Sequence, residues 1–376
     1  MSLGSSKALN DLQISVIRQM NQKKTADTID LGLGQLLFSA PQSLRQAGAD
    51  SFLTDNLGYG PTAGIPKLRQ AIADDFNEQQ KTDARHENVI ITNGAEHALY
   101  SLIQAMINPG DEILIPEIGY PAYPGISKLF GAKIIEYKLD EGFGIDSDDL
   151  SSKLSSRTKI VIINSPSNPT GAVASQELLK QISSKVARQN PEILILSDEV
   201  YSSLNYYTKP ISSIAKYYKN TAVISSVSKQ AAGAGVRIGW LIAPEAIIEQ
   251  VTKIVQYSVT SAALPNQKAV LSYLGSPRSS SAINDRLKEN RQIVIETLSG
   301  TSLETTIPQG AFYYFADISK HGKSQQVADS LLDNQNLLVI PGIAFGKAGD
   351  KYMRISFGVE VEVLKSGLKN IIETLG

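Results

Sequence analysis

The sequence predicts an α/β fold with a mostly parallel sheet in a large domain, joined to a smaller α/β domain. Strand-like apolar runs alternate with segments of helical period up to about residue 275, and the pattern then changes. Such alternation is typical of right-handed crossovers between parallel strands. With 376 residues, the chain is also long enough for more than one hydrophobic core.

Seven apolar runs are the expected strands of the large domain, at residues 89–92, 112–115, 133–137, 159–163, 193–196, 222–225 and 237–242. Two sets of apolar residues between the strands each share one helical face: Ile65, Leu68, Ile72 and Phe76, and then Ala95, Leu99, Leu102 and Met106. Both sets predict helices that pack on the sheet. After about residue 275, a long polar helix is expected at 281–298, followed by strand-like stretches at 311–315 and 353–357.

Composition excludes several classes of function. The net charge of −1 provides no long-range field for nucleic acid or anionic lipid. Without cysteine and with three scattered histidines, we expect no metal centre. No apolar run reaches the roughly 20 residues of a membrane span, and the polar start lacks the apolar core of a signal peptide. We therefore expect a cytoplasmic protein that uses an organic cofactor.

The strongest chemical signal is the run Ser226-Val227-Ser228-Lys229, with Arg237 eight residues after the lysine. A lysine at the end of a strand, two hydroxyls beside it and an arginine one loop later supply an imine-forming amine and a clamp for a dianion. Pyridoxal phosphate requires both. Taken alone, however, Ser-x-Ser-Lys could equally be ordinary surface sequence.

Two further motifs precede this run, Asn-Pro-Thr-Gly at 168–171 and Asp-Glu-Val-Tyr at 198–201, each just after an apolar run. The ordered set resembles the class I/II aminotransferases, the aspartate aminotransferase superfamily of pyridoxal phosphate enzymes of fold type I. The resemblance runs from about residue 32 to residue 357. It implies a large cofactor-binding domain at 45–275 with a seven-stranded sheet, and a small domain built from both termini, 1–44 and 276–376.

The resemblance assigns roles to the motif residues. Lys229 would bind the cofactor aldehyde and move the proton between the substrate Cα and the cofactor, which requires a lowered pKa. Asp198 would pair with the pyridine nitrogen and keep the ring an electron sink, although a helix N-cap is an alternative. Tyr201 and Asn168 would hydrogen-bond the cofactor phenolate oxygen. Tyr120 would stack on the ring, unless it is simply a core tyrosine.

The cofactor phosphate needs hydrogen-bond donors, and the segment Gly94-Ala95-Glu96 follows a strand and opens a helix. Backbone amides and the helix dipole suit a dianion there, but a glycine before a helix is common, so this signal is weak alone. The resemblance adds Ser226, Ser228, Arg237 and, from the neighbouring subunit of a homodimer, Tyr59.

Arg354 matches the arginine that binds the α-carboxylate of the substrate, for which a planar guanidinium is better suited than an ammonium. The alternative is an arginine on a strand surface. Asn168 and the backbone near Gly34 would assist, and the small domain would close over the substrate to exclude water.

Three positions depart from the family pattern. Glu96 stands where the branch that uses dicarboxylic substrates has a lysine, so we expect a donor with a neutral or cationic side chain; Glu96 could also face solvent or cap its helix. Gly-Gln-Leu-Leu-Phe at 34–38 replaces the usual Gly-x-Pro-Asp-Phe, and Ala231 replaces a common aromatic residue. Both could reshape the substrate pocket.

The predicted function is a ping-pong aminotransferase that moves the amino group of an amino acid, not strictly an acidic one, to a 2-oxo acid. A C–S β-lyase, decarboxylase or synthase on the same fold is one alternative, because a Cα carbanion can partition in several ways. A non-catalytic regulatory domain that senses pyridoxal phosphate is a more distant one, since no basic DNA-binding module precedes residue 30.

Overall fold

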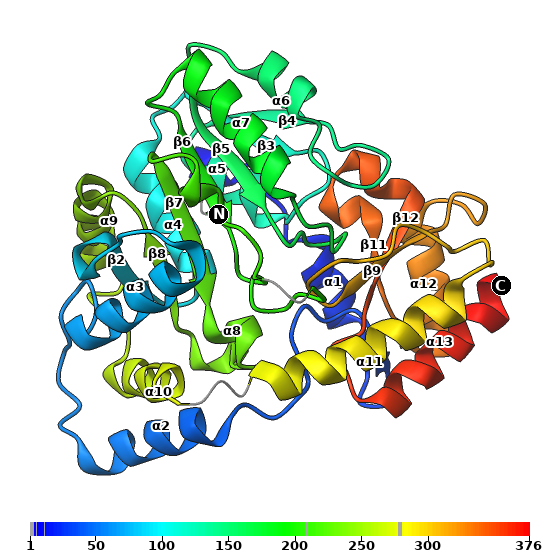
Figure 1. Ribbon diagram of the computed structural model, residues 1–376. Coiled ribbons are helices and arrows are strands. Elements are labelled where there is room, and N and C mark those ends of the chain that lie inside the picture. Colours follow the sequence, from blue (N-terminus) through cyan, green and yellow to red (C-terminus); the bar gives the residue numbers. More distant parts are fainter. Residues whose placement is uncertain (1–3, 5, 11, 208–209, 277–279) are drawn as a thin grey trace.

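A computed structural model describes residues 4, 6–10, 12–207, 210–276 and 280–376. Its centre is a sheet of seven strands in the order β2-β8-β7-β6-β5-β3-β4 (Figure 1). In that order the strands are Val89–Thr92, Gly239–Ile242, Thr221–Ser226, Leu194–Asp198, Thr158–Asn164, Glu112–Pro116 and Lys133–Tyr137. β8 is antiparallel to β2 and β7, and the other neighbouring pairs are parallel. This confirms the predicted sheet.

Helices cover both faces of the sheet because the strands are apolar on both sides. In β7, for example, Ile224 packs in one hydrophobic core and Val223 in another. The first face carries α4 (Ala95–Met106), α5 (Ala122–Leu129) and α9 (Glu245–Ser258). The second carries α3 (Pro66–Gln80), α6 (Ser147–Lys153), α7 (Gln176–Gln189) and α10 (Leu264–Leu274). The two predicted apolar faces lie on α3 and α4.

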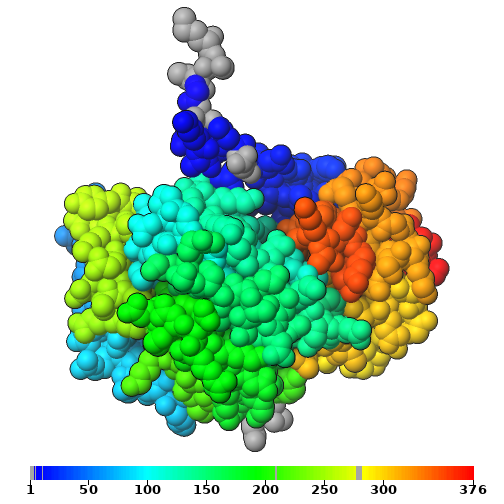
Figure 2. All heavy atoms as spheres, turned by 90° about the horizontal axis from the view of Figure 1, so that it is seen from above, coloured from blue at the N-terminus to red at the C-terminus, as the bar shows by residue number. Residues whose placement is uncertain are grey.

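The N-terminal and C-terminal parts of the chain meet beside the large sheet. β1 (Ile29–Asp30) pairs in parallel with β10 (Leu337–Leu338). A second small sheet has the antiparallel order β11-β12-β9, made of Ile340–Pro341, Tyr352–Ser356 and Tyr313–Asp317. The accompanying helices are α1 (Val16–Gln22), α11 (Ser280–Leu298), α12 (Ser324–Gln335) and α13 (Val361–Leu375). In Figure 2 the described residues before α1 extend away from the body, and α2 (Gln42–Thr54) packs on α10.

Two local features differ from the sequence prediction. Lys229 does not lie at a strand end but in a single helical turn, α8 (Val227–Gln230), because Ser226 caps this turn by accepting the amide of Ser228 at 3.3 Å. The next strand begins at Gly239 and not at Arg237, since Arg237 has a left-handed backbone with φ of 55°. As a result, the side chains of Lys229 and Arg237 both lie in short segments at the edge of the sheet, outside its strands.

Glu112 provides a test of the fold that is independent of function. Its carboxylate is 3% exposed and accepts hydrogen bonds from Ser155 Oγ at 2.5 Å, Arg157 Nη2 at 2.9 Å and Lys133 Nζ at 3.2 Å. The Ser155 hydroxyl and then the two cations, acting against desolvation, lower the pKa of Glu112 from 4.5 to about 2. Because the folded pKa lies below the unfolded one, this stabilisation exists above about pH 4.5 and is lost as the pH falls towards 2.

We therefore expect Glu112→Gln to lower the free energy of unfolding by about 1–3 kcal/mol near neutral pH, and by less near pH 3. Urea denaturation of both proteins at the two pH values measures this difference. Glu136→Gln, at an exposed position of the neighbouring β4, is the matched control and should change little. An equal loss at both pH values for Glu112→Gln would contradict the assignment.

Candidate active site

The candidate site lies at the edge of the sheet where three neighbouring strands end. Asn168 follows β5, Asp198 is the last residue of β6, and Lys229 follows β7. Because β5, β6 and β7 are parallel, their carboxyl ends meet at one edge. The three motifs, which are far apart in the sequence, are therefore neighbours in space.

Lys229 is a buried amine held by the N-terminal part of the chain. Its Nζ donates a hydrogen bond to the carbonyl oxygen of Gly34 and lies 6.0 Å from the centre of the Tyr201 ring. Burial and then the positive charge of Arg354 lower the pKa of Lys229 from 10.5 to about 8, although Asp198 acts in the opposite direction. At a pKa of about 8, roughly a tenth of this amine is uncharged at pH 7, far more than for an ordinary lysine, and the neutral form is the one that a nucleophile or base requires.

Asp198 is a buried carboxyl group held by two donors. Tyr123 Oη donates to its Oδ2 at 2.7 Å, and the amide of Val200 donates to its Oδ1 at 3.3 Å. Burial raises the pKa of Asp198, while the hydrogen bond from Tyr123 opposes this rise. The residue closes a turn and does not cap a helix. A cation placed beside it would compensate the desolvation of its charge.

Arg354 lies inside the protein and not on a strand surface, since it is 1% exposed. Its Nη1 donates to Asn168 Oδ1 at 2.8 Å and its Nη2 to the carbonyl oxygen of Gly32 at 2.6 Å. The guanidinium carbon lies 4.3 Å from the centre of the Tyr313 ring. Arg354 Nε is buried without a hydrogen-bond partner among the described residues. The site thus holds a cation with unused hydrogen-bonding capacity, as a carboxylate receptor would.

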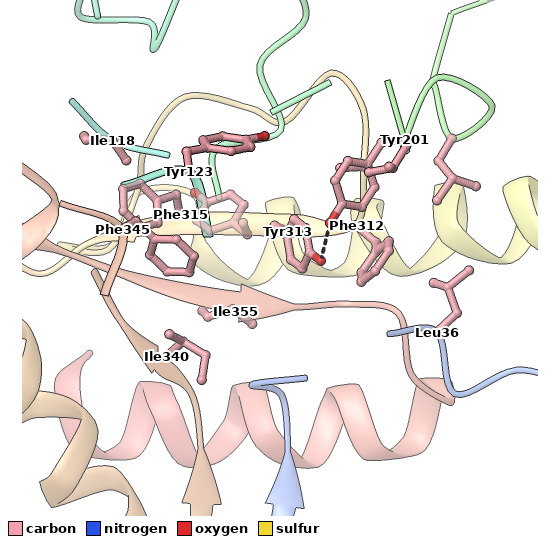
Figure 3. Packing of buried hydrophobic residues seen from close by; sticks show 14 of the residues in the cluster. Leu36, Ile118, Tyr123, Tyr201, Phe312, Tyr313, Phe315, Ile340, Phe345 and Ile355 are labelled. Atoms are coloured by element: carbon pink, nitrogen blue, oxygen red, sulfur yellow. Dashed lines mark hydrogen bonds between the residues drawn. The ribbon is translucent and has the colours of Figure 1, made fainter. Parts of the chain in front are cut away.

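Two tyrosines connect this arginine to the lysine. Tyr201 Oη and Tyr313 Oη are 2.9 Å apart and share a hydrogen bond, drawn as the dashed line in Figure 3. Tyr201 also lies edge-on to Phe312, with ring centres 5.8 Å apart. Burial raises the pKa of Tyr201, so its hydroxyl keeps its proton and can donate it in a hydrogen bond.

A cradle for an anion lies at the start of α4. Gly94 precedes this helix with φ of +86°, and a Cβ atom there would come within 2.6 Å of Arg237 Nη2. Arg237 donates to the carbonyl oxygens of Ala234 at 3.0 Å and Asn93 at 3.1 Å. The amides of the helix start and this guanidinium together provide donors and positive potential. The remaining predicted residues of the cradle are Ala95, which opens α4, and Ser226 and Ser228, both buried around α8.

The residues at this edge fit pyridoxal phosphate. A buried amine of lowered pKa suits its aldehyde, a buried carboxyl group suits its ring nitrogen, and the cradle left open by Gly94 suits its phosphate. Among the described residues there is no group of three or more metal-ligating side chains. In the same part of the chain, no helix has the length and apolar character needed to span a membrane.

Three predicted residues stand apart from these contacts. Tyr59 is 89% exposed, and no hydrogen bond between described residues reaches it. Glu96 is exposed in the first turn of α4, yet its charge raises the pKa values of Tyr120 and Lys229, so its field reaches the site. Tyr120 packs edge-on against Tyr123, with ring centres 5.7 Å apart. Its pKa is raised mainly by burial.

Sequence reasoning missed Tyr123, Tyr313 and Gly32. Tyr123 lies three residues after Tyr120, and its spacing alone does not show that its hydroxyl reaches Asp198. Tyr313 lies in a predicted apolar strand, where an aromatic residue is expected for packing alone. Ala231, a departure from the family pattern, is buried in the hydrophobic cluster on the second face of the sheet, so it does not line the catalytic side.

Comparison with known proteins agrees with this geometry. The profile of the family described as aminotransferase class I and II matches residues 26–371. An aspartate aminotransferase of Pyrococcus horikoshii is 34% identical over 371 residues, covering 96% of this chain and 94% of that protein. A probable N-acetyl-LL-diaminopimelate aminotransferase of Bacillus subtilis is 33% identical over 370 residues, covering 96% of this chain and 93% of that protein.

Among solved structures, aspartate aminotransferase from Thermus thermophilus with maleate superimposes with a TM-score of 0.94 at 28% identity, covering 99% of this chain and all of that one. The family match, the similar sequences and this shared fold agree with one another. The chain therefore belongs to the class I and II aminotransferases, and it is a pyridoxal phosphate-dependent enzyme that transfers amino groups.

Proposed function

We propose that this aminotransferase uses Lys229 as its cofactor-binding lysine and proton carrier, and that it prefers donors whose side chain is neutral or cationic. The observation that carries the first part is the buried Lys229 amine, with its pKa lowered to about 8 between Arg354 and Asp198. Bound pyridoxal phosphate supplies an aldehyde that binds amines and a ring that accepts the electron pair released at the substrate Cα.

The other residues bind and orient. Asp198, held by Tyr123, is placed to pair with a ring nitrogen and keep it protonated. The amides at Gly94 and the guanidinium of Arg237 hold the phosphate, with Ser226 and Ser228 in the same wall. Tyr201 donates to the phenolate oxygen, and Asn168, which orients Arg354, assists. Tyr120 covers the ring.

Arg354 receives the α-carboxylate of the substrate. Its Nε lacks a partner among the described residues, and Tyr313 and Asn168 hold its guanidinium plane. A carboxylate pairing with this buried cation would offset the cost of burying the charge. Gly34 adds its backbone and leaves room, since a Cβ there would lie 3.1 Å from Tyr313 Oη.

Glu96 supports the preference for a neutral or cationic donor. It adds negative potential at Tyr120 and Lys229, whereas the opposing effect of Arg18 on Tyr120 is the weakest of those that act on it. No side-chain hydrogen bond caps the start of α4, so Glu96 does not serve as a cap. Similar proteins carry names that differ in substrate, including aspartate, prephenate and N-acetyl-LL-diaminopimelate. These names do not determine the donor of this chain, which depends on its own residues.

Two structural proposals accompany this function. A homodimer in which Tyr59 completes the partner's site is supported by the exposure of Tyr59 and of neighbouring apolar residues, among them Leu53 and Leu57. A large domain at 45–275 and a small domain at 1–44 and 276–376, which closes over the substrate, are supported by the pairing of β1 with β10. The cytoplasmic localisation expected from the sequence remains a prediction.

The same carbanion chemistry could serve a lyase or decarboxylase, but the related proteins reported above are aminotransferases. The products distinguish the reactions. Transfer yields one 2-oxo acid for each new amino acid, whereas β-elimination yields ammonia and pyruvate without any need for an acceptor.

Lys229→Ala should reduce multiple turnover by about 10²–10⁴-fold or more, because the variant lacks the amine that moves the proton. Borohydride reduction followed by intact-mass measurement should leave the cofactor attached to the wild type but not to the variant. In the wild-type apoenzyme, cofactor attachment should speed up as the pH rises through about 8, since the neutral amine is the nucleophile. Lys253→Ala, an exposed lysine on α9, is the control. Wild-type turnover in Lys229→Ala would refute the assignment.

Glu96→Lys should raise kcat/KM for aspartate relative to leucine and lysine by about tenfold, as expected for reversing one partly screened charge near the substrate. The control is Glu177→Lys, which changes an exposed acidic residue in the first turn of α7 and so matches the effect on a helix dipole. An unchanged donor preference in Glu96→Lys would show that Glu96 does not act on the substrate.

Mixed dimers test the shared site. Co-expression of a Tyr59→Ala chain with a Lys229→Ala chain should restore activity well above that of either variant alone. Random pairing in a symmetric dimer leaves about a quarter of the sites with both residues intact. If each chain used its own Tyr59, the mixture would only average the two variants.

A further inference from the structure

Tyr313 contacts both sides of the active site through one side chain. It is fully buried at the start of β9, beside β12, which carries Arg354. Arg354 pairs with Phe315, and side chains two residues apart on a strand share a face, so the Tyr313 ring lies beside the guanidinium. The Tyr313 hydroxyl lies 2.9 Å from that of Tyr201 (Figure 3). Tyr313 therefore joins the residue assigned to the substrate carboxylate to the residue assigned to the cofactor phenolate.

The two tyrosine hydroxyls hold two protons but share one hydrogen bond. A phenolic hydroxyl donates one hydrogen bond and can also accept. The bond between Tyr201 and Tyr313 uses one of the two protons. Neither hydroxyl makes another hydrogen bond with a described residue, and a buried donor without an acceptor is costly. The pair therefore has one proton left for an acceptor that binds at this site.

The place of Tyr201 determines how the two protons are used. Its ring centre lies 6.0 Å from Lys229 Nζ, whereas the Tyr313 ring lies against Arg354. When Tyr201 donates to the phenolate oxygen of the cofactor, a charged acceptor is preferred over a neutral hydroxyl. The single proton of Tyr201 is then used, so the bond between the two tyrosines persists only with Tyr313 as its donor. Both protons are satisfied in this arrangement.

The surroundings of Tyr313 suit it to be the donor. Burial raises the pKa of both Tyr201 and Tyr313, so both hydroxyls keep their protons. The charge of Arg354 is the largest effect that opposes this rise in Tyr313. A nearby positive charge makes a hydroxyl more acidic and so a stronger donor. Arg354 thus polarises Tyr313 towards Tyr201.

We propose that Tyr313 is a positioning residue, which donates its hydroxyl proton to Tyr201 and so strengthens the hydrogen bond from Tyr201 to the phenolate oxygen of the cofactor. This inference rests on the proposed function, which places Tyr201 at that oxygen. Hydrogen bonds in a chain polarise one another, so a hydroxyl that accepts one donates more strongly. A stronger bond to the phenolate stabilises its negative charge, and the bound cofactor then takes up a proton only at a lower pH.

Two variants separate the hydroxyl of Tyr313 from its ring. In Tyr313→Phe, pH titration of the visible absorbance of the holoenzyme should show a midpoint raised by about 0.1–0.6 pH unit, because a charged hydrogen bond loses roughly a tenth to a third of its strength. The KM for the amino donor should change by less than about twofold, since the ring still lies beside Arg354. Tyr313→Leu should raise the midpoint and also raise this KM about three- to tenfold.

A double variant tests whether Tyr313 acts through Tyr201. Tyr201→Phe alone should raise the midpoint more than Tyr313→Phe does, and combining the two should give no further rise. Tyr314→Phe is the matched control, because Tyr314 faces the other side of β9, where its Oη accepts the amide of Thr305 at 3.1 Å. Its midpoint should equal that of the wild type. Circular dichroism and cofactor content establish that each variant is folded and loaded.

The other outcomes separate this inference from the proposed function. A raised midpoint in Tyr201→Phe with an unchanged or lowered one in Tyr313→Phe would overturn the inference and leave the proposed function intact. Shifts that add in the double variant would show that Tyr313 acts without Tyr201, and would also overturn it. A raised KM in Tyr313→Phe with an unchanged midpoint would assign the hydroxyl to the substrate. An unchanged midpoint in Tyr201→Phe would refute both the inference and the placement of Tyr201 at the phenolate.

Discussion

The site depends on two cations buried close together. Burial disfavours the positive charges of both Lys229 and Arg354, and the charge of Arg354 further lowers the pKa of Lys229. Asp198 is the carboxyl group that acts on Lys229 in the opposite direction most strongly. The combined effect lowers the pKa of Lys229. Arg354 keeps a buried Nε without a partner among the described residues, which a carboxylate could use. If both cations were held in ion pairs, Lys229 would keep its proton and Arg354 would have no hydrogen-bond donor left for the carboxylate of a substrate.

The parallel sheet makes this arrangement possible. The carboxyl ends of β5, β6 and β7 deliver Asn168, Asp198 and Lys229 to one edge, while the N-terminal segment supplies the Gly34 carbonyl and β12 supplies Arg354. The lysine therefore contacts a segment nearly 200 residues earlier in the chain, at a sequence separation of 195. The site is therefore complete only when the N-terminal segment and β12 are both in place beside the large sheet, so residues near both ends of the chain contribute to its chemistry.

The sequence predicted what depends on local pattern or on ordered motifs. The seven strands and the α3 and α4 faces follow from periodicity. The candidate residues Asp198, Lys229 and Arg354 were found because their ordered motifs resemble those of the family. Tyr123 and Tyr313 could not be found in this way, because an aromatic residue in an apolar segment is equally compatible with packing. Their roles depend on where a hydroxyl ends after the chain has folded. The one-turn helix at Lys229 was missed because it depends on a single serine cap.

The alternation of side chains about the end of β6 places two neighbouring carboxyl groups in different surroundings. Asp198 accepts a hydrogen bond from Tyr123 on the catalytic side, whereas Glu199 accepts hydrogen bonds from Ser197 and Ser213. Both carboxyl groups are buried, and burial raises the pKa of each. A shift of the backbone at this strand end would therefore disturb a buried hydrogen-bonded carboxyl group on either side, so the packing around Glu199 helps to fix the position of Asp198.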